Sequence, residues 1–109
     1  MELVEHVLPD VVVLQPRDRL TVENEADLKA AVSHHLHAGR IRMVLDLAFV
    51  PYIDSCGLGT IAQTHLNMHR AGGWLKLKNV TGHNLHLLSV TRLLNVIGEY
   101  VPERRAASA

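Results

Sequence analysis

An apolar run lies near the middle of the chain, at residues 41–47, and only Arg42 and Asp46 interrupt it. Such a run is typical of a strand covered on both faces, in a parallel or mixed sheet packed by helices. Apolar residues recur at helical spacing on either side of the run, over residues 28–36 before it and residues 58–66 after it. In a chain of 109 residues this succession predicts one α/β domain.

Three further segments resemble strands. Residues 74–80 alternate between apolar side chains and lysines, as in a strand with one solvated side. Together with residues 41–47 and the helix between them, this segment predicts a right-handed crossover with two parallel strands. Residues 3–8 and 11–14 predict two short strands joined by a turn at Pro9-Asp10.

Threonines and a glycine mark the expected helix ends. Thr21 is expected to cap the first helix, and Thr81 a third helix that ends at Gly98. Residues 99–101 are expected to add a short last strand. The predicted order is β-β-α-β-α-β-α-β, a mixed α/β sheet of about four to five strands packed by about three helices.

The composition is that of a globular protein, with 48% hydrophobic and 20% charged residues. We assign residues 1–101 to the domain and residues 102–109, which are small and charged, to a flexible C-terminal tail. Eleven basic residues balance eleven acidic ones, and aromatic residues make up 4% of the chain. A neutral chain with few aromatic residues does not suggest a nucleic-acid partner.

The single cysteine and the hydropathy of the chain limit the disulfide, metal and membrane features to expect. Cys56 is the single cysteine, which excludes an internal disulfide and a multi-cysteine zinc site. The N-terminal residues do not form a signal-peptide pattern, and no apolar run approaches the roughly 20 residues of a membrane span. We therefore expect a cytoplasmic protein without a membrane partner, a cofactor or a metal. A neutral surface is also compatible with a monomer.

The turn between the central strand and the second helix is the candidate site. It reads Asp54-Ser55-Cys56-Gly57-Leu58-Gly59, and open α/β sheets bind their ligands at the carboxyl ends of such strands. Ser55 is expected at the N-cap, and Gly57 and Gly59 should let another molecule approach the backbone. A phosphate on Ser55 would bring almost two negative charges beside Asp54 and would repel a partner fitted to this turn. On spacing alone, a serine that only caps the helix is favoured over a switch, although spacing does not decide between the two roles.

Residues 43–59, which read Met-Val-Leu-Asp-Leu-Ala-Phe-Val-Pro-Tyr-Ile-Asp-Ser-Cys-Gly-Leu-Gly, resemble the signature of the STAS domain in its anti-sigma factor antagonist branch. The order of strands and helices is also similar, so the resemblance covers roughly residues 2–101. It implies a bacterial, cytoplasmic protein that binds an anti-sigma factor and so frees a sigma factor. In this family the anti-sigma factor is also a serine kinase with a Bergerat-type ATP site.

The resemblance also implies a switch and a binding surface. The kinase would phosphorylate Ser55, which breaks the complex, and a phosphatase would restore it. No catalytic residue is implied, because the domain acts by binding. The implied partner-binding residues are Thr21, Asp54, Ser55, Cys56, Gly57, Leu58 and Gly59.

The chain departs from the family pattern in several places. Cys56 stands where serine or threonine is common, which leaves one hydroxyl in the turn. An acidic residue near the end of the second strand is replaced by residues 18–21, Asp-Arg-Leu-Thr, so the acidic contact is lost or moved to Asp18 or Glu23. The third helix opens with residues 81–86, Thr-Gly-His-Asn-Leu-His, instead of the usual polar and basic segment.

Other functions remain open at this point. Eight histidines suggest a metal site, but His65 and His69 lack a third ligand at suitable spacing, and a structural role is favoured. A thiol or serine hydrolase would use Ser55 or Cys56, but the chain has no Gly-x-Ser-x-Gly elbow. A STAS module that acts as a scaffold, without a switch, in a signalling assembly or a transporter is the main alternative.

Overall fold

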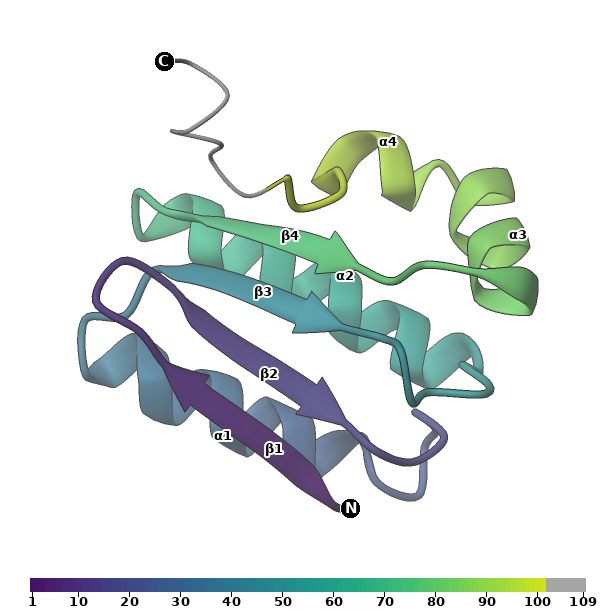
Figure 1. Cartoon of the computed structure of the whole chain (residues 1–109), viewed down its shortest axis with the longest axis horizontal. Coiled ribbons are helices and arrows are strands. Elements are labelled where there is room, and N and C mark those ends of the chain that lie inside the picture. The colour runs from purple at the N-terminus through teal and green to yellow at the C-terminus, as the bar shows by residue number, and fades with distance from the viewer. Residues whose placement is uncertain (102–109) are drawn as a thin grey trace, which may run out of the picture.

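The computed structural model describes residues 1–101, which form a four-stranded mixed sheet with helices packed against it (Figure 1). The strands are β1 (Leu3–Val7), β2 (Val12–Pro16), β3 (Arg42–Asp46) and β4 (Trp74–Lys78), and they lie in this order across the sheet. β1 pairs with β2 antiparallel, whereas β2, β3 and β4 are parallel. The predicted mixed sheet is therefore confirmed, and the tail predicted at residues 102–109 lies outside the described residues.

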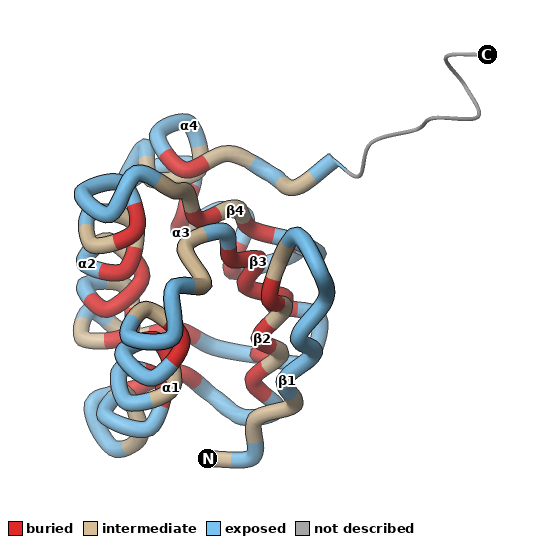
Figure 2. The backbone as a smooth tube through the Cα atoms, turned by 90° about the vertical axis from the view of Figure 1, so that its left-hand side faces the viewer, coloured by how far each residue is buried: buried red, intermediate tan, exposed pale blue. Residues whose placement is uncertain are grey.

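Two helices, α1 (Glu25–His37) and α2 (Ser55–Arg70), cover one face of the sheet. Both lie behind the sheet in Figure 1, and Figure 2 shows them on the same side in the perpendicular view. Alternate residues of the strands point to this side, and those of β2, β3 and β4 form the core. The core residues from β2, β3 and β4 are Val12, Leu14, Met43, Leu45, Leu75 and Leu77.

The strand at residues 41–47 was predicted to be covered on both faces, and residues 43–46 are indeed buried on both, but helices cover only one of the two faces. Met43 points toward the helices, whereas Val44 points to the opposite face of the sheet, where Figure 1 shows no helix. Val44 is nevertheless fully buried. Its neighbours in register on that face are Val13 and Lys76, so we attribute its burial to side chains of the adjacent strands.

The third predicted helix is two helices, α3 (Gly82–Val90) and α4 (Leu93–Ile97). The chain breaks at Arg92, whose φ of 63° is left-handed and cannot continue a helix. The strand predicted at residues 99–101 is reduced to an isolated bridge between Leu77 and Glu99. The described residues thus contain four helices and four strands.

The first helix begins later than predicted, because Thr21 does not cap it. Asn24 is the N-cap residue, and its side chain makes no capping bond to α1. Instead, the Asn24 side-chain oxygen accepts a hydrogen bond from the Thr21 N–H at 3.0 Å, and the Thr21 hydroxyl accepts one from the Glu23 N–H at 3.3 Å. These local bonds stabilise a turn before α1. No helix within residues 1–101 has the length and apolar character to span a membrane.

Candidate functional site

The loop after β2 and the loop after β3 are joined by backbone hydrogen bonds at the carboxyl end of the sheet. The Leu20 N–H donates to the Tyr52 carbonyl at 2.9 Å, and the Asp54 N–H donates to the Leu20 carbonyl at 3.1 Å. Leu20 and Ile53 also form a parallel bridge, and both side chains are buried. The start of α2 is therefore fixed against the loop that leads into α1.

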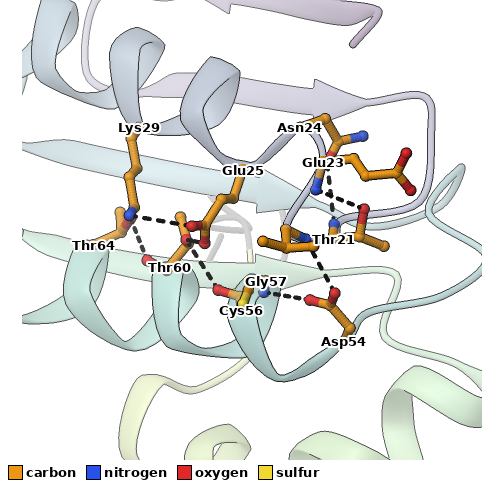
Figure 3. Close-up of polar contacts among 11 residues, drawn as sticks. Thr21, Glu23, Asn24, Glu25, Lys29, Asp54, Cys56, Gly57, Thr60 and Thr64 are labelled. Carbon is orange, nitrogen blue, oxygen red and sulfur yellow. Dashed lines mark hydrogen bonds and ion pairs between the residues drawn. The ribbon is translucent and has the colours of Figure 1, made fainter.

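Asp54 holds this junction with both of its carboxylate oxygens. Oδ1 accepts a hydrogen bond from the Gly57 N–H at 2.8 Å, and Oδ2 accepts one from the Val22 N–H at 3.0 Å (Figure 3). The prediction that Ser55 caps α2 is wrong, because Asp54 is the N-cap and Ser55 is the first helical residue. A carboxylate can cap a helix and bind a second loop at once, which a single hydroxyl oxygen does less well.

Ser55 is exposed at the first position of α2. The first N–H groups of a helix carry partial positive charge and favour a nearby anion. A phosphate on Ser55 would lie at this positive end, although it would also lie next to the Asp54 carboxylate. The position is therefore accessible to a modifying enzyme, and the helix can tolerate the added charge.

The two glycines of the turn have different environments. Gly57 is buried, and a Cβ there would lie 2.3 Å from the Leu20 carbonyl oxygen. Gly59 is exposed, and a Cβ there would meet no atom within 4 Å. The prediction that Gly57 leaves room for another molecule is wrong, because the neighbour that approaches it is the chain's own Leu20. Gly59 does present open backbone to a partner.

The other predicted contact residues also differ in how much of their surface is exposed. Thr21 is 8% exposed and holds its own loop, so its side chain offers little surface. Cys56 and Leu58 are half-buried, and Leu58 packs against the core. Val22 was not predicted to belong to the site, although it is 63% exposed and its N–H donates to Asp54.

A second polar link joins α1 to the first turns of α2. The Thr60 hydroxyl lies 2.8 Å from Glu25 Oε2 and 3.1 Å from the Cys56 carbonyl, so it can donate to either oxygen. Lys29 Nζ lies 3.5 Å from Glu25 Oε1, and Figure 3 shows this group beside the Asp54 junction. The start of α2 is thus attached to the loop before α1 through Asp54 and to α1 itself through Thr60. Neither Glu25 nor Thr60 was predicted to contribute.

The possible acidic contacts and the paired histidines can also be located. Asp18 accepts a hydrogen bond from the Arg19 N–H, and Glu23 is exposed beside Val22. His65 and His69 stack with their ring centroids 6.1 Å apart. Within residues 1–101, no three His, Cys, Asp or Glu side chains are grouped so that they could hold a metal ion.

The pKa of the Asp54 carboxylate is lowered by the bonds it accepts. The Gly57 N–H bond lowers the pKa of Asp54 below its ordinary value of 3.8, burial opposes this shift, and bonds from Val22 and Cys56 add to it. Because the folded-state pKa is lowered, the stabilising contribution is complete above pH 3.8 and is lost as the pH falls through the folded-state value.

We therefore predict that the Val22 and Gly57 amide resonances titrate together in NMR spectra, with a midpoint below pH 3.8. In Asp54→Asn this titration should be absent from both amides. A midpoint above pH 3.8, or an unchanged titration in the variant, would contradict the assignment of Asp54 as the group that joins the two loops.

The sheet order and the turn before α2 define a STAS-type α/β domain. The model of the STAS domain family matches residues 3–107, and the chain belongs to this family. The chain is 30% identical over 95 residues to the "Putative anti-sigma factor antagonist TM1081 homolog" of Thermotoga neapolitana, an alignment that covers 86% of this chain and 84% of the relative.

Solved structures show the same architecture. TM1081 from Thermotoga maritima, also described as a putative anti-sigma factor antagonist, has a crystal structure similar to this chain. The two are 28% identical with a TM-score of 0.83, and the match covers 97% of this chain and 92% of that one. The anti-sigma factor antagonist SpoIIAA in its unphosphorylated form is 13% identical with a TM-score of 0.71, covering 98% and 94%. At this identity the second likeness concerns the fold alone.

Proposed function

We propose that this protein is an anti-sigma factor antagonist that is switched off by phosphorylation of Ser55. The observation that carries the proposal is an exposed serine at the first position of α2, in a turn that Asp54 fixes against a second loop. The partner would be an anti-sigma factor with serine kinase activity, and a phosphatase would remove the phosphate. The complex would form in the cytoplasm and release a sigma factor for transcription.

The unmodified turn offers a mixed surface to a partner. Ser55 and Gly59 are exposed on α2, and Val22 and Tyr52 expose 63% and 45% of their surfaces on the two joined loops. Apolar side chains beside small polar ones favour a dehydrated protein contact. Asp18 and Glu23 are both exposed on the loop that carries Val22, so either would supply the family's acidic contact if this chain retains it.

Phosphorylation would change this surface in one step. The added phosphate carries almost two negative charges and would lie beside the carboxylate of Asp54. Burying these charges against a partner costs free energy unless the partner supplies matching cations. Asp54 is already bonded to the N–H groups of Gly57 and Val22, so it would remain in place and add to the repulsion.

Binding explains the turn better than catalysis does. A serine or cysteine nucleophile needs a base, which a third group then orients. Both oxygens of Asp54 are occupied by backbone N–H groups, so Asp54 does not orient a histidine beside Ser55 or Cys56. The names of the Thermotoga relatives also favour an antagonist.

Displacement of a sigma factor tests the proposed function. We expect the purified protein to release a labelled sigma factor from one of the anti-sigma factors of its host, measured as a fall in fluorescence anisotropy. Ser55→Asp serves as the matched control and should not release it. If no pair of sigma and anti-sigma factors responds to the folded protein, the antagonist function is wrong and the scaffold function is favoured.

A further inference from the structure

The face of the sheet opposite α1 and α2 carries no helix within residues 1–101 (Figures 1 and 2). The strand register places two rows of side chains across this face, with one member from each strand, and a pair next to them. We call this set the open face. Its members are His6, Val13, Val44 and Lys76 in one row, Val4, Gln15, Asp46 and Lys78 in the next, and the pair Arg42 and Trp74.

The charges on the open face are mostly positive. Arg42 and Lys78 are exposed, and Lys76 is half-buried, with its Nζ donating to the Ile97 carbonyl at 3.0 Å. All three lie on the two neighbouring strands β3 and β4. The open face therefore has a cationic half on the β4 side, although the whole chain has a formal net charge of +0.

The carboxylate of Asp46 does not cancel this charge pattern at the surface. Asp46 is 5% exposed and accepts hydrogen bonds from the side chains of Gln15 and Asn79 and from the Ala48 N–H. Burial would raise the pKa of Asp46, but these bonds and nearby Lys78 lower it below 3.8. The negative charge thus lies on this face but is buried and hydrogen-bonded, whereas Arg42 and Lys78 face solvent.

Aromatic and apolar groups lie beside the cations. Trp74 stacks on Tyr100 with ring centroids 6.2 Å apart and an interplanar angle of 25°. Both rings are half-buried, as are Val4 and Val13 on the strands of the other half. Tryptophan, tyrosine and arginine are the residues most enriched where partners bind tightly. The open face therefore combines a charged half with an apolar half.

We propose that the open face is a second docking surface, which binds an acidic, amphipathic segment of a protein partner. Acidic side chains of that segment would pair with Arg42 and Lys78, and its apolar side chains would pack on Val13 and Trp74. Charge complementarity supports this occupant, because the solvent-facing cations are unbalanced on this face. The inference goes beyond the proposed switch, because Ser55 lies at the carboxyl end of the sheet rather than on this face.

A protein segment fits the open face better than a nucleic acid does. Nucleic-acid affinity rises with the number of phosphates that cations neutralise. Lys76 is already bonded to a carbonyl, and the Arg17 guanidinium at the edge of the face donates to Gln15 Oε1 and lies over the Phe49 ring. This leaves Arg42 and Lys78 as the solvent-facing cations without such a partner among the rows of this face. The valine side chains of this face also offer no hydrogen bonds to phosphate or sugar. Two cations beside an apolar strip match alternating acidic and apolar side chains.

The single tryptophan of the chain lies on the open face, so its fluorescence reports binding there. The probe is a 14-residue helical peptide with glutamates along one stripe and leucines beside it, and its control carries glutamine at each glutamate. We expect saturable change of the Trp74 emission with the glutamate peptide and weaker binding of the glutamine peptide, by several-fold to about tenfold. The interaction should weaken as salt is added.

Charge reversal then locates the site. Arg42→Glu with Lys78→Glu should weaken binding of the glutamate peptide by about tenfold or more. The matched control is Arg70→Glu with Arg92→Glu, two exposed arginines at the end of α2 and between α3 and α4. If the first variant does not fold, Arg42→Gln with Lys78→Gln replaces it and should show a smaller loss.

The proposal is overturned if the two peptides bind equally or if both double variants bind alike. It is also overturned if an oligothymidylate of equal charge binds the face more tightly than the glutamate peptide. The Ser55→Asp protein should bind the peptide as the unmodified protein does. Peptide binding by Ser55→Asp therefore tests the open face independently of the Ser55 switch, because either proposal can fail while the other holds.

Discussion

Gly57→Ala is expected to lower the free energy of unfolding by about 3 kcal/mol, at the upper end of what overpacking costs. The new Cβ would lie 2.3 Å from the Leu20 carbonyl oxygen and 2.9 Å from its carbonyl carbon. The carbonyl also accepts the Asp54 N–H bond, so it cannot turn away without breaking that bond. The loop before α1 or the first turn of α2 must therefore shift.

Gly59→Ala is the matched control, because it adds the same methyl group two residues further along the same helix. A Cβ at Gly59 meets no atom within 4 Å, so the change should be neutral or stabilise by up to about 1 kcal/mol. Urea unfolding followed by circular dichroism measures both variants. Equal stabilities for the two variants would show that the close contact between Gly57 and Leu20 does not exist in solution.

Ser55→Asp is expected to weaken binding of the anti-sigma factor by at least about 100-fold, because a charge buried against the partner costs several kcal/mol. The variant should fold normally, since an acidic residue at the start of a helix is favourable and Ser55 is exposed. Ser55→Ala removes a hydroxyl without adding charge, and it should bind within about threefold of the unmodified protein.

Isothermal titration calorimetry with the anti-sigma factor distinguishes these variants. A Ser55→Asp protein that is folded and binds as tightly as the unmodified protein would contradict the switch. Loss of binding by Ser55→Ala as well would mean that the hydroxyl contributes to the interface directly. The charge mechanism therefore requires that the two substitutions differ.

The central part of the fold was predictable from the sequence, because local patterns and tertiary packing agree there. The run at residues 41–47 and the alternation at residues 74–80 correspond to β3 and β4, with small differences at the ends. The break at Arg92 was not predictable, since leucines continue at helical spacing through it. The side of the sheet that stays open was also hidden, because Val44 is buried by neighbouring strands rather than by a helix.

The position of the site was predictable, but its internal contacts were not. The turn at residues 54–59 follows the central strand, as the sequence indicated. Either Asp54 or Ser55 can cap a helix, and the choice depends on Val22, which is distant in the sequence. The role of Gly57 depends in the same way on Leu20. A glycine in the sequence does not show whether a partner or the chain itself lies against it.

Mapping of phosphate on the protein tests the central proposal most directly. The protein is incubated with Mg-ATP and each candidate anti-sigma kinase of its host, and the modified residue is identified by mass spectrometry. We predict phosphate on Ser55 of the unmodified protein and none in Ser55→Ala. Phosphate at another residue, or none with any kinase although the protein is folded, would contradict a switch at Ser55.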